Sequence, residues 1–310
     1  MFLFLERGNL LKLKRLAEEE VVKSQQRGYF DEHLATLYST AYGQPYLYED
    51  KYLLYADSTT RDVSLTLFRL DEESGSNEER LACIKELTAH LRPHKLTITS
   101  PSKLPSRIND FVCRKEYNDK DYQIDLKQFD ESLLGRSYKN LRYHVNHAKR
   151  CGYVLEVGKT LTSSHINIIA HFLEKSRNYE SWDLALYLGL SEYVSKFASP
   201  RLFNVFSNGI LIGFDVIDAL SDVITTPIGF YLDYPSISDF LVYQEILYAK
   251  RQRFKILDIG WGCNDLGLES FKIKWKAVPR FCVCMQVFIK GSKSLNTPMK
   301  NSPYSSFKLP

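Results

Sequence analysis

Apolar and polar residues alternate in two ways along the chain, one typical of strands and the other of helices. In the first half, the pattern predicts strands over 46–48, 52–56, 63–68, 95–99 and 122–126, with a helix over 78–91. Further helices are predicted over 9–26 and from there through Tyr42. The first half is therefore expected to mix helices and strands.

The second half shows the same kind of pattern more clearly. Helices are predicted over 138–150, 163–178, 191–198, 237–251 and 266–275, and strands over 153–157, 202–206, 210–217, 223–232, 256–259 and 281–288. Asn208-Gly209 joins two of these strands, and this dipeptide favours tight hairpins because both residues tolerate positive φ. The second half is also expected to be an α/β unit.

Residues 63–108 and 223–274 share the order strand, helix, strand, helical segment. We interpret this order as a structural duplication, with chance alternation of helices and strands as the alternative. The expected domains are residues 1–128 and 129–289. Residues 290–310 are rich in Ser, Pro, Asn and Lys and are expected to form a disordered basic tail.

Composition narrows the class of protein. A content of 44% hydrophobic and 25% charged residues excludes a collagen-like or low-complexity chain. The net charge of +4 is matched by the tail lysines Lys290, Lys293, Lys300 and Lys308, so the remainder is neutral. A surface coated with positive charge for nucleic acid is therefore not expected, and any anion must be bound by local clusters.

Cysteine and histidine usage points to a cytoplasmic protein without a metal. The six cysteines include no CxxC pair, and the seven histidines show no ligand spacing. Glu6 and Arg7 interrupt the apolar start of the chain, so no signal-peptide core is present, and no apolar run is long enough to span a membrane. Cys282 and Cys284 fall on one face of a predicted strand and are expected to pack in the core.

Two stretches resemble a known group of enzymes on a matching order of elements. The first is Asp121-Tyr122-Gln123-Ile124-Asp125-Leu126, followed by Leu134-Gly135-Arg136-Ser137-Tyr138 and by Val145-Asn146-His147-Ala148. The second is Leu257-Asp258-Ile259-Gly260, followed by Asn264-Asp265-Leu266-Gly267-Leu268 and by Phe271-Lys272-Ile273-Lys274-Trp275. Together they resemble the catalytic domain of Fem-type peptidyltransferases and bacterial phosphatidylglycerol lysyltransferases, which have the GNAT acyltransferase fold.

The resemblance implies an α/β fold with tandem GNAT-like domains and mixed sheets. It also implies an enzyme that moves an activated aminoacyl group from aminoacyl-tRNA to an amine or hydroxyl on a small molecule, peptide or lipid headgroup. Phe271 and Lys272 match the Phe-Lys pair of the group, in which the lysine neutralises charge on the donor or on the developing oxyanion. The alternative for Lys272 and Lys274 is a solvated helix face.

Coenzyme A is a less expected donor than aminoacyl-tRNA. CoA-dependent GNAT enzymes hold the pyrophosphate with a glycine-rich turn before a helix, because glycine lets backbone amides approach the anion. Here the turn reads Tyr234-Pro235-Ser236-Ile237-Ser238-Asp239, without glycine and with an acidic residue. No other cofactor is expected, although a degenerate CoA site would look the same.

The helix predicted over 138–150 is basic and has no acidic residue. Lys139, Arg142 and Lys149 or Arg150 fall near one stripe of it, which suits tRNA phosphates or an anionic acceptor. The alternative is a solvated helix between domains.

For proton transfer, Tyr231 and Asp233 at the end of one strand are candidates, because the reaction centre is expected there. Asp215 and Asp218 on the preceding strand are weaker candidates. Asp258 and Asn264 are assigned to substrate binding. Aspartates at strand ends also cap turns, which is the structural alternative.

The sequence thus predicts an aminoacyltransferase. An acyl-CoA- or carrier-dependent N-acyltransferase and a catalytically silent binding module of the same fold are the alternatives. The cleft is expected in the second domain, between the ends of the strands at 230–233 and 256–260, because GNAT-like sheets splay there.

Overall fold

The computed structural model describes residues 13–15, 44–48, 52–57, 60–67, 76–175, 181–220, 222–261 and 266–291. Among these residues, the division into two compact units falls after Asp119 and after Arg280. We call residues up to Asp119 and from Phe281 the first unit, and Lys120–Arg280 the second unit. The helix predicted over 9–26 is wrong at residues 13–15, which form a strand, and its other residues lie outside the described residues. The helix predicted from there through Tyr42 also lies outside them, as does the tail predicted over 290–310 except for its first two residues.

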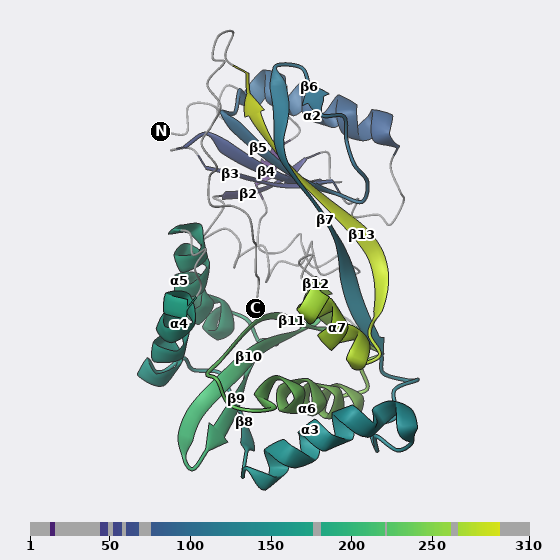
Figure 1. Cartoon of the computed structure of the whole chain (residues 1–310). Helices are drawn as coiled ribbons and strands as arrows, with labels where there is room; N and C mark the ends of the chain where they lie inside the picture. The colour runs from purple at the N-terminus through teal and green to yellow at the C-terminus, as the bar shows by residue number, and fades with distance from the viewer. Residues whose placement is uncertain are drawn as a thin grey trace. The chain divides into compact units, whose positions relative to one another are not determined.

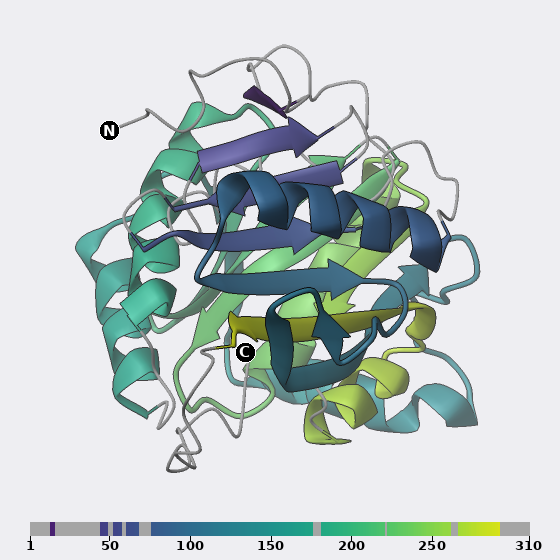
Figure 2. The same cartoon turned by 90° about the horizontal axis from the view of Figure 1, so that it is seen from above.

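The first unit is a mixed sheet with one described α-helix. Its strands β1 to β4 pair antiparallel in chain order, helix α2 follows, and β5 returns parallel to β4. Figure 2 shows α2 lying across this sheet. The elements are β1 (Leu13–Arg15), β2 (Gln44–Tyr48), β3 (Tyr52–Ala56), β4 (Asp62–Thr66), α2 (Asn77–Leu91), β5 (Lys95–Ser100) and the short β6 (Arg107–Ile108).

Local sequence explains where α2 begins and how it packs. The hydroxyl of Ser76 accepts a hydrogen bond from the backbone N–H of Glu79 at 3.1 Å, and this caps the helix. Cys83, Ile84 and Leu87 are buried and belong to the core of this unit.

The second unit repeats this arrangement. Strands β8 to β11 pair antiparallel in chain order, helix α6 follows, and β12 pairs parallel with β11 (Figure 1). The strands are β8 (Val154–Gly158), β9 (Arg201–Ser207), β10 (Ile210–Leu220), β11 (Val223–Tyr231) and β12 (Ile256–Trp261). The helices are η2 (Arg136–Tyr138), α3 (Lys139–Arg150), α4 (Ser163–Lys175), α5 (Ser181–Lys196), α6 (Ile237–Arg251) and α7 (Leu266–Lys274).

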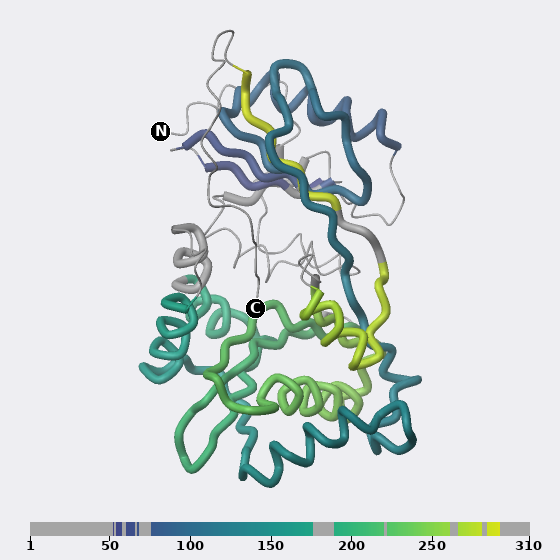
Figure 3. Tube along the Cα trace, in the orientation of Figure 1, coloured from purple at the N-terminus to yellow at the C-terminus, as the bar shows by residue number. Residues whose placement is uncertain are grey.

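The last strand of each sheet comes from the other half of the sequence. Strand β13 (Val278–Lys290) pairs antiparallel with β5 in the first unit. The end of β7 (Phe111–Asp125) pairs antiparallel with β12 in the second unit, and β7 can be followed without a break in Figure 3. The predicted duplication is therefore confirmed, because the strands of the two units have the same order and the same directions.

This exchange differs from the predicted boundary at 128/129, which placed 281–288 in the second domain. Alternation along a segment identifies a strand but not its partner, so the exchange left no local signal. Two further elements differ in length, because β7 begins at Phe111 rather than 122, and α5 begins at Ser181 rather than 191.

Helices pack on both faces of the sheet in the second unit. Helix α6 contacts β9 to β12, and α3 packs on α6. Helix α4 contacts β10 and β11 through two ring pairs, His165 with Phe214 at 4.8 Å and Phe172 with Phe230 at 5.4 Å between centroids. Because successive side chains of a strand point to opposite faces, Asp215 points away from α4, towards α6.

Candidate functional site

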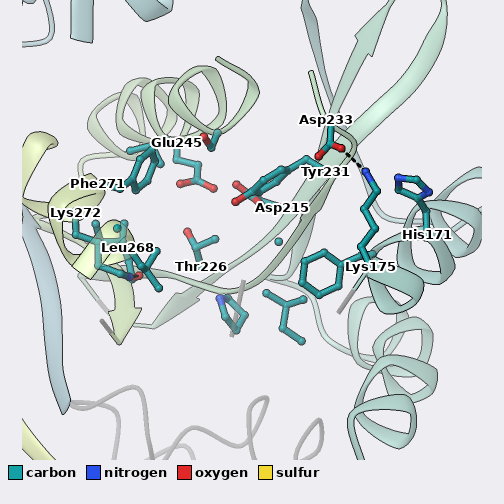
Figure 4. A pocket seen from close by; sticks show the side chains of 18 residues that line it. His171, Lys175, Asp215, Thr226, Tyr231, Asp233, Glu245, Leu268, Phe271 and Lys272 are labelled. Atoms are coloured by element: carbon teal, nitrogen blue, oxygen red, sulfur yellow. Dashed lines mark hydrogen bonds and ion pairs between the residues drawn. The ribbon is translucent and has the colours of Figure 1, made fainter. Parts of the chain in front are cut away.

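Strands β11 and β12 separate after a short paired segment. Their register joins Val223 with Ile256 and ends at Thr225 with Asp258, although β11 continues to Tyr231 and β12 to Trp261. A cavity of about 580 Å³ opens where they part. Its lining comes from α4, β10, β11, α6, β12 and α7 and includes His171, Lys175, Asp215, Thr226, Gly229, Tyr231, Asp233, Glu245, Ile259, Phe271 and Lys272 (Figure 4).

This position agrees with the predicted cleft. Sequence reasoning placed it between the ends of the strands at 230–233 and 256–260, and Tyr231, Asp233 and Ile259 lie in its wall. All four residues predicted to be catalytic, Lys272, Phe271, Asp233 and Tyr231, line the cavity. Their catalytic roles stay predictions.

Lys272 is the buried cation of the cavity wall. Its side chain is only 4% exposed, and its ammonium donates a hydrogen bond to the carbonyl oxygen of Ile259. Its positive charge also opposes the rise in pKa that burial causes in three nearby carboxyl groups, those of Asp121, Asp258 and Glu245. A solvated helix face, the alternative for Lys272, is therefore wrong.

Asp121 and Asp258 form a buried acidic network behind Lys272. Gln123 donates hydrogen bonds from Nε2 to Asp258 at 3.1 Å and to Asp121 at 3.3 Å, and accepts one from Arg280 at 3.2 Å. Burial and then the neighbouring charge of Asp258 raise the pKa of Asp121 to about 8, against the opposing effects of Lys272 and Arg280. The network holds Lys272 in place electrostatically.

Asp258 does not line the cavity. It is 8% exposed, and its carboxylate accepts a hydrogen bond from the backbone N–H of Gly260 at 2.8 Å. Burial raises its pKa, which hydrogen bonds from Gly260 and Gln123 partly offset. Asp258 therefore interacts with Lys272 rather than with the cavity. From the sequence, it was assigned to substrate binding. Asn264, the other residue so assigned, lies outside the described residues.

A second pair of carboxyl groups, Asp215 and Glu245, faces the cavity (Figure 4). Burial raises the pKa of Asp215 to about 6. The pKa of Glu245 is raised well above its usual value, first by burial and then by the facing charge of Asp215. Ionisation of one group therefore disfavours ionisation of the other, and the two titrate as a coupled pair.

Gly229 makes room for Asp215. A Cβ atom at position 229 would lie 1.9 Å from Oδ1 of Asp215, so a side chain there must displace the carboxyl group. The neighbouring strand β11 also brings Thr226 to the cavity. The absence of a side chain at 229 thus decides where the Asp215 carboxyl group lies.

Tyr231 and Asp233 lie at the end of β11. The pKa of Tyr231 is raised to about 12 by burial and by the charges of Asp215 and Asp239, so its phenol stays protonated. The side chain of Asp233 is 83% exposed and accepts a hydrogen bond from Lys175, which lowers its pKa. A paired carboxylate with a lowered pKa is a weaker base than Asp215.

The basic helix α3 does not reach the cavity. Arg142 donates hydrogen bonds to the backbone carbonyls of Leu133 and Gly135, and the ammonium of Lys149 lies 5.3 Å from the ring centroid of Tyr243. Lys139 and Arg150 are exposed. Two of the predicted binding residues thus have contacts within the protein, and two face solvent.

The first turn of α6 is occupied by its own acidic residue. Asp239 is 4% exposed, and its Oδ1 accepts a hydrogen bond from Nε1 of Trp275 at 3.0 Å and an ion pair from Lys274 at 2.6 Å. Ser236 directly precedes this turn and has a φ of +63°, so a serine stands at a position that favours glycine. Lys274 is therefore also not part of a solvated face, because it neutralises Asp239.

Sequence reasoning missed Glu245 and undervalued Asp215. Glu245 stands in the apolar stripe of α6 with Leu241, Ile246 and Ala249, which are all buried. An acidic residue at a core position of an amphipathic helix is the signal that could have found it. Asp215 gave a similar signal, between apolar residues on a buried strand.

The described residues contain neither a cluster for a metal ion nor a helix that could span a membrane. In the part of the chain that the structure describes, no group of three or more His, Cys, Asp or Glu side chains is placed to hold a metal ion. Nor does any described helix combine the length and apolar character needed to cross a membrane. Cys284 is buried and free, as expected for a core residue.

Comparison with known proteins gives structural but no sequence matches. No protein-family model matches the chain, and no curated protein matches its sequence significantly. The structure is similar to a tandem GNAT protein from the clavulanic acid biosynthesis pathway, with a TM-score of 0.56 and 12% identity over 92% of this chain and 100% of that one.

Two further solved structures belong to the group that the motifs resemble. FemX is similar with a TM-score of 0.55 and 11% identity, over 89% of this chain and 96% of that one. L-PGS from Bacillus licheniformis is similar with a TM-score of 0.53 and 14% identity, over 85% of this chain and 92% of that one. The chain therefore has the tandem GNAT-like fold that these proteins share.

Proposed function

We propose that the protein is an acyltransferase that moves an aminoacyl group from aminoacyl-tRNA to an amine or hydroxyl acceptor. The observation that carries this proposal is the buried Lys272 in the wall of the cavity where β11 and β12 separate. Similarity to FemX and to a lysylphosphatidylglycerol synthetase supports the class of reaction.

The separated strands suit an extended donor. Past Thr225, the edge of β11 that faces β12 has no strand partner among the residues that the structure describes, so we take its backbone amides and carbonyls as available to a bound chain. The ester end of the donor would lie against Thr226, Tyr231 and Lys272. Its carbonyl carbon is then open to attack by the acceptor.

Lys272 supplies charge to the transition state. Attack on the ester forms a C–N or C–O bond and places negative charge on the former carbonyl oxygen before the tRNA oxygen leaves. A fixed ammonium stabilises this oxyanion by roughly 3 kcal/mol when water is excluded. Asp121, Asp258 and Glu245 favour the charged form of the lysine, which desolvation alone would disfavour.

The first turn of α6 favours tRNA over coenzyme A as the donor. A pyrophosphate needs the backbone amides and positive dipole of a helix N-terminus. Here the carboxylate of Asp239 is buried in that turn and is held by Trp275 and Lys274. A pyrophosphate would therefore meet an existing negative charge.

Helix α3 supports the same choice of donor. Lys139 and Arg150 are exposed, and the last turn carries His147, Lys149 and Arg150 without an acidic residue. Such a face suits the phosphates of the tRNA acceptor stem.

The test is incubation of the protein with charged tRNA and cell extract, with mass spectrometry of the products. We expect an aminoacylated product that is lost with Lys272→Ala and retained with Lys127→Ala, a change at an exposed lysine. Calorimetry with acetyl-CoA is the counter-test. A dissociation constant in the low micromolar range, roughly −8 kcal/mol, would contradict the tRNA-dependent proposal and favour a CoA-dependent enzyme.

A further inference from the structure

Buried polar atoms without a hydrogen-bond partner of normal geometry gather on one wall of the cavity. Glu245 is fully buried, and in the described part of the chain neither of its carboxyl oxygens has a hydrogen-bond partner of normal geometry. The same is true of Oγ1 of Thr226. Asp215 and Thr226 are still near enough to shift the pKa of Glu245 in opposite directions. All three side chains line the cavity (Figure 4).

The charges around this wall leave the pair electronegative. Asp215 on β10 has a pKa of about 6 and is ionised at neutral pH, so the pair carries negative charge, and the pKa of Glu245 on α6 is raised well above its usual value. Lys272 on α7 offsets part of it, although that lysine also faces Asp121 and Asp258. Lys175 on α4 is paired with Asp233, and Tyr231 on β11 stays neutral.

We infer that Asp215, Glu245 and Thr226 bind the primary ammonium group of a substrate. An ammonium carries one positive charge and three N–H donors, which matches a wall that offers acceptors and a negative charge. A neutral hydroxyl has one donor and no charge, and the described residues offer no third carboxylate or imidazole for a metal ion.

This inference rests on the proposed function, because aminoacyl transfer provides two sources of the group. One is the α-ammonium of the aminoacyl donor, which lies next to the ester carbonyl. The other is an aliphatic amine that accepts the aminoacyl group. L-Alaninamide represents the first source and n-butylamine the second.

The experiment is calorimetric titration of the full chain with each amine, with 1-butanol as the neutral control. We expect at least one amine to bind and 1-butanol not to bind. Glu245→Gln and Asp215→Asn should each weaken amine binding at least tenfold, because each leaves the pair with only one ionisable carboxyl group and changes its shape little. Asp222→Asn, an equal change at a surface ion pair with Lys255 outside the cavity, should leave binding unchanged.

Binding should also depend on pH and release protons. A cation favours the fully ionised pair, so affinity should rise between pH 5 and pH 8, while titrations in buffers of different ionisation enthalpy should report proton release. Both dependences should weaken in Glu245→Gln, because Asp215 is then the only carboxyl group of the pair that titrates. If one variant fails to fold, the other variant and the pH dependence of the unsubstituted protein still decide the result.

Two results would overturn the inference: equal amine affinity in the unsubstituted protein and in Glu245→Gln, or no binding of either amine at 100 mM. Failure of the proposed function gives a different result. Amine binding that needs Glu245, without transfer from any charged tRNA, would keep the ammonium site and remove the aminoacyltransferase. Aminoacyl transfer that is unaffected by Glu245→Gln would keep the aminoacyltransferase and remove the ammonium site.

Discussion

The two units share one strand order but differ where the parallel strands meet. In the first unit, β4 and β5 remain paired over the whole of β4, from Asp62 with Lys95 to Thr66 with Thr99. In the second unit, β11 and β12 part after Thr225. The helices differ as well, because the core face of α2 is formed by residues such as Ile84 and Leu87, whereas that of α6 includes Glu245.

The second unit differs from the first in having separated parallel strands and a cavity with charged walls. In the first unit, full pairing keeps the backbone groups of β4 and β5 hydrogen-bonded, and the one buried charged residue of α2, Arg80, donates hydrogen bonds to Asn77 and Ser102. Separation of the strands exposes backbone groups, and the cavity beside them is lined by the charged residues Asp215, Glu245 and Lys272. Such groups cost folding free energy, and they are typical of sites that bind or react. The comparison therefore assigns the chemistry to the second unit.

The largest effect is expected from Lys272→Ala. Removal of the ammonium should reduce aminoacyl transfer by on the order of a hundredfold or more. It should also lower the melting temperature, because Asp121 and Asp258 lose a compensating charge. Steady-state transfer assays below both melting temperatures separate the two effects.

Lys95→Ala in the first unit is the matched control. Lys95 is half exposed and pairs with Asp62 at 3.5 Å, so its loss should cost less than about 1 kcal/mol and leave transfer unchanged. Equal effects of the two substitutions on transfer would contradict the contrast between the units.

Gly229→Ala should have the next largest effect. The added Cβ forces the Asp215 carboxyl group out of its position, and a displacement of about 1 Å can reduce a rate by roughly tenfold to a hundredfold. Transfer kinetics measure the loss. Gly158→Ala is the control, because its Cβ meets only the end of the Asn204 side chain at 3.1 Å, and unchanged kinetics in both variants would remove Asp215 from the site.

The pH dependence of stability should come from the buried acids of the second unit. The pKa of Asp121 is about 8 in the folded protein against 3.8 ordinarily, so the folded state holds a proton that the unfolded state has lost. Stability should therefore fall as the pH rises from about 4 to about 8, and Asp215 should contribute to the fall up to about pH 6.

Asp121→Asn should flatten this dependence in thermal unfolding between pH 5 and pH 9. Asp62→Asn, a change at an exposed carboxylate of the first unit, should keep the slope of the unsubstituted protein. An unchanged slope in Asp121→Asn would mean that this carboxyl group does not stay protonated in the folded protein.

The smallest effect is expected in the first unit. Ser76→Ala removes the cap of α2 and should lower the free energy of unfolding by about 1 kcal/mol, measured by denaturant titration. Transfer should be unaffected. A large loss of transfer would show that the first unit takes part in the reaction.

Much of the fold could be predicted from the sequence, because periodicity reports how each element is buried. The strands and helices of the second half, the duplication and the place of the cleft all followed from local pattern and order. The partner of a strand depends on residues far away in the sequence, so the exchange of β7 and β13 could not be predicted.

The site was predicted less completely. Lys272 and Tyr231 were found because they match a motif and a strand end. Glu245 was missed, since its meaning depends on Asp215, which is distant in the sequence, and on the space that Gly229 leaves. A solvated helix face stayed open as the alternative for Lys274, because its ion pair with Asp239 joins two helices that are separate in the sequence.

Photo-crosslinking with a non-hydrolysable aminoacyl-tRNA analogue tests the central claim most directly. The analogue carries an amide in place of the ester and a photoreactive group on the amino acid, and crosslinked peptides are identified by mass spectrometry. We predict crosslinks to residues of β11 from Thr226 to Tyr231 or to α7 in the second unit. Crosslinks confined to β4, α2 or β5 in the first unit, or none above the level of uncharged tRNA, would contradict it.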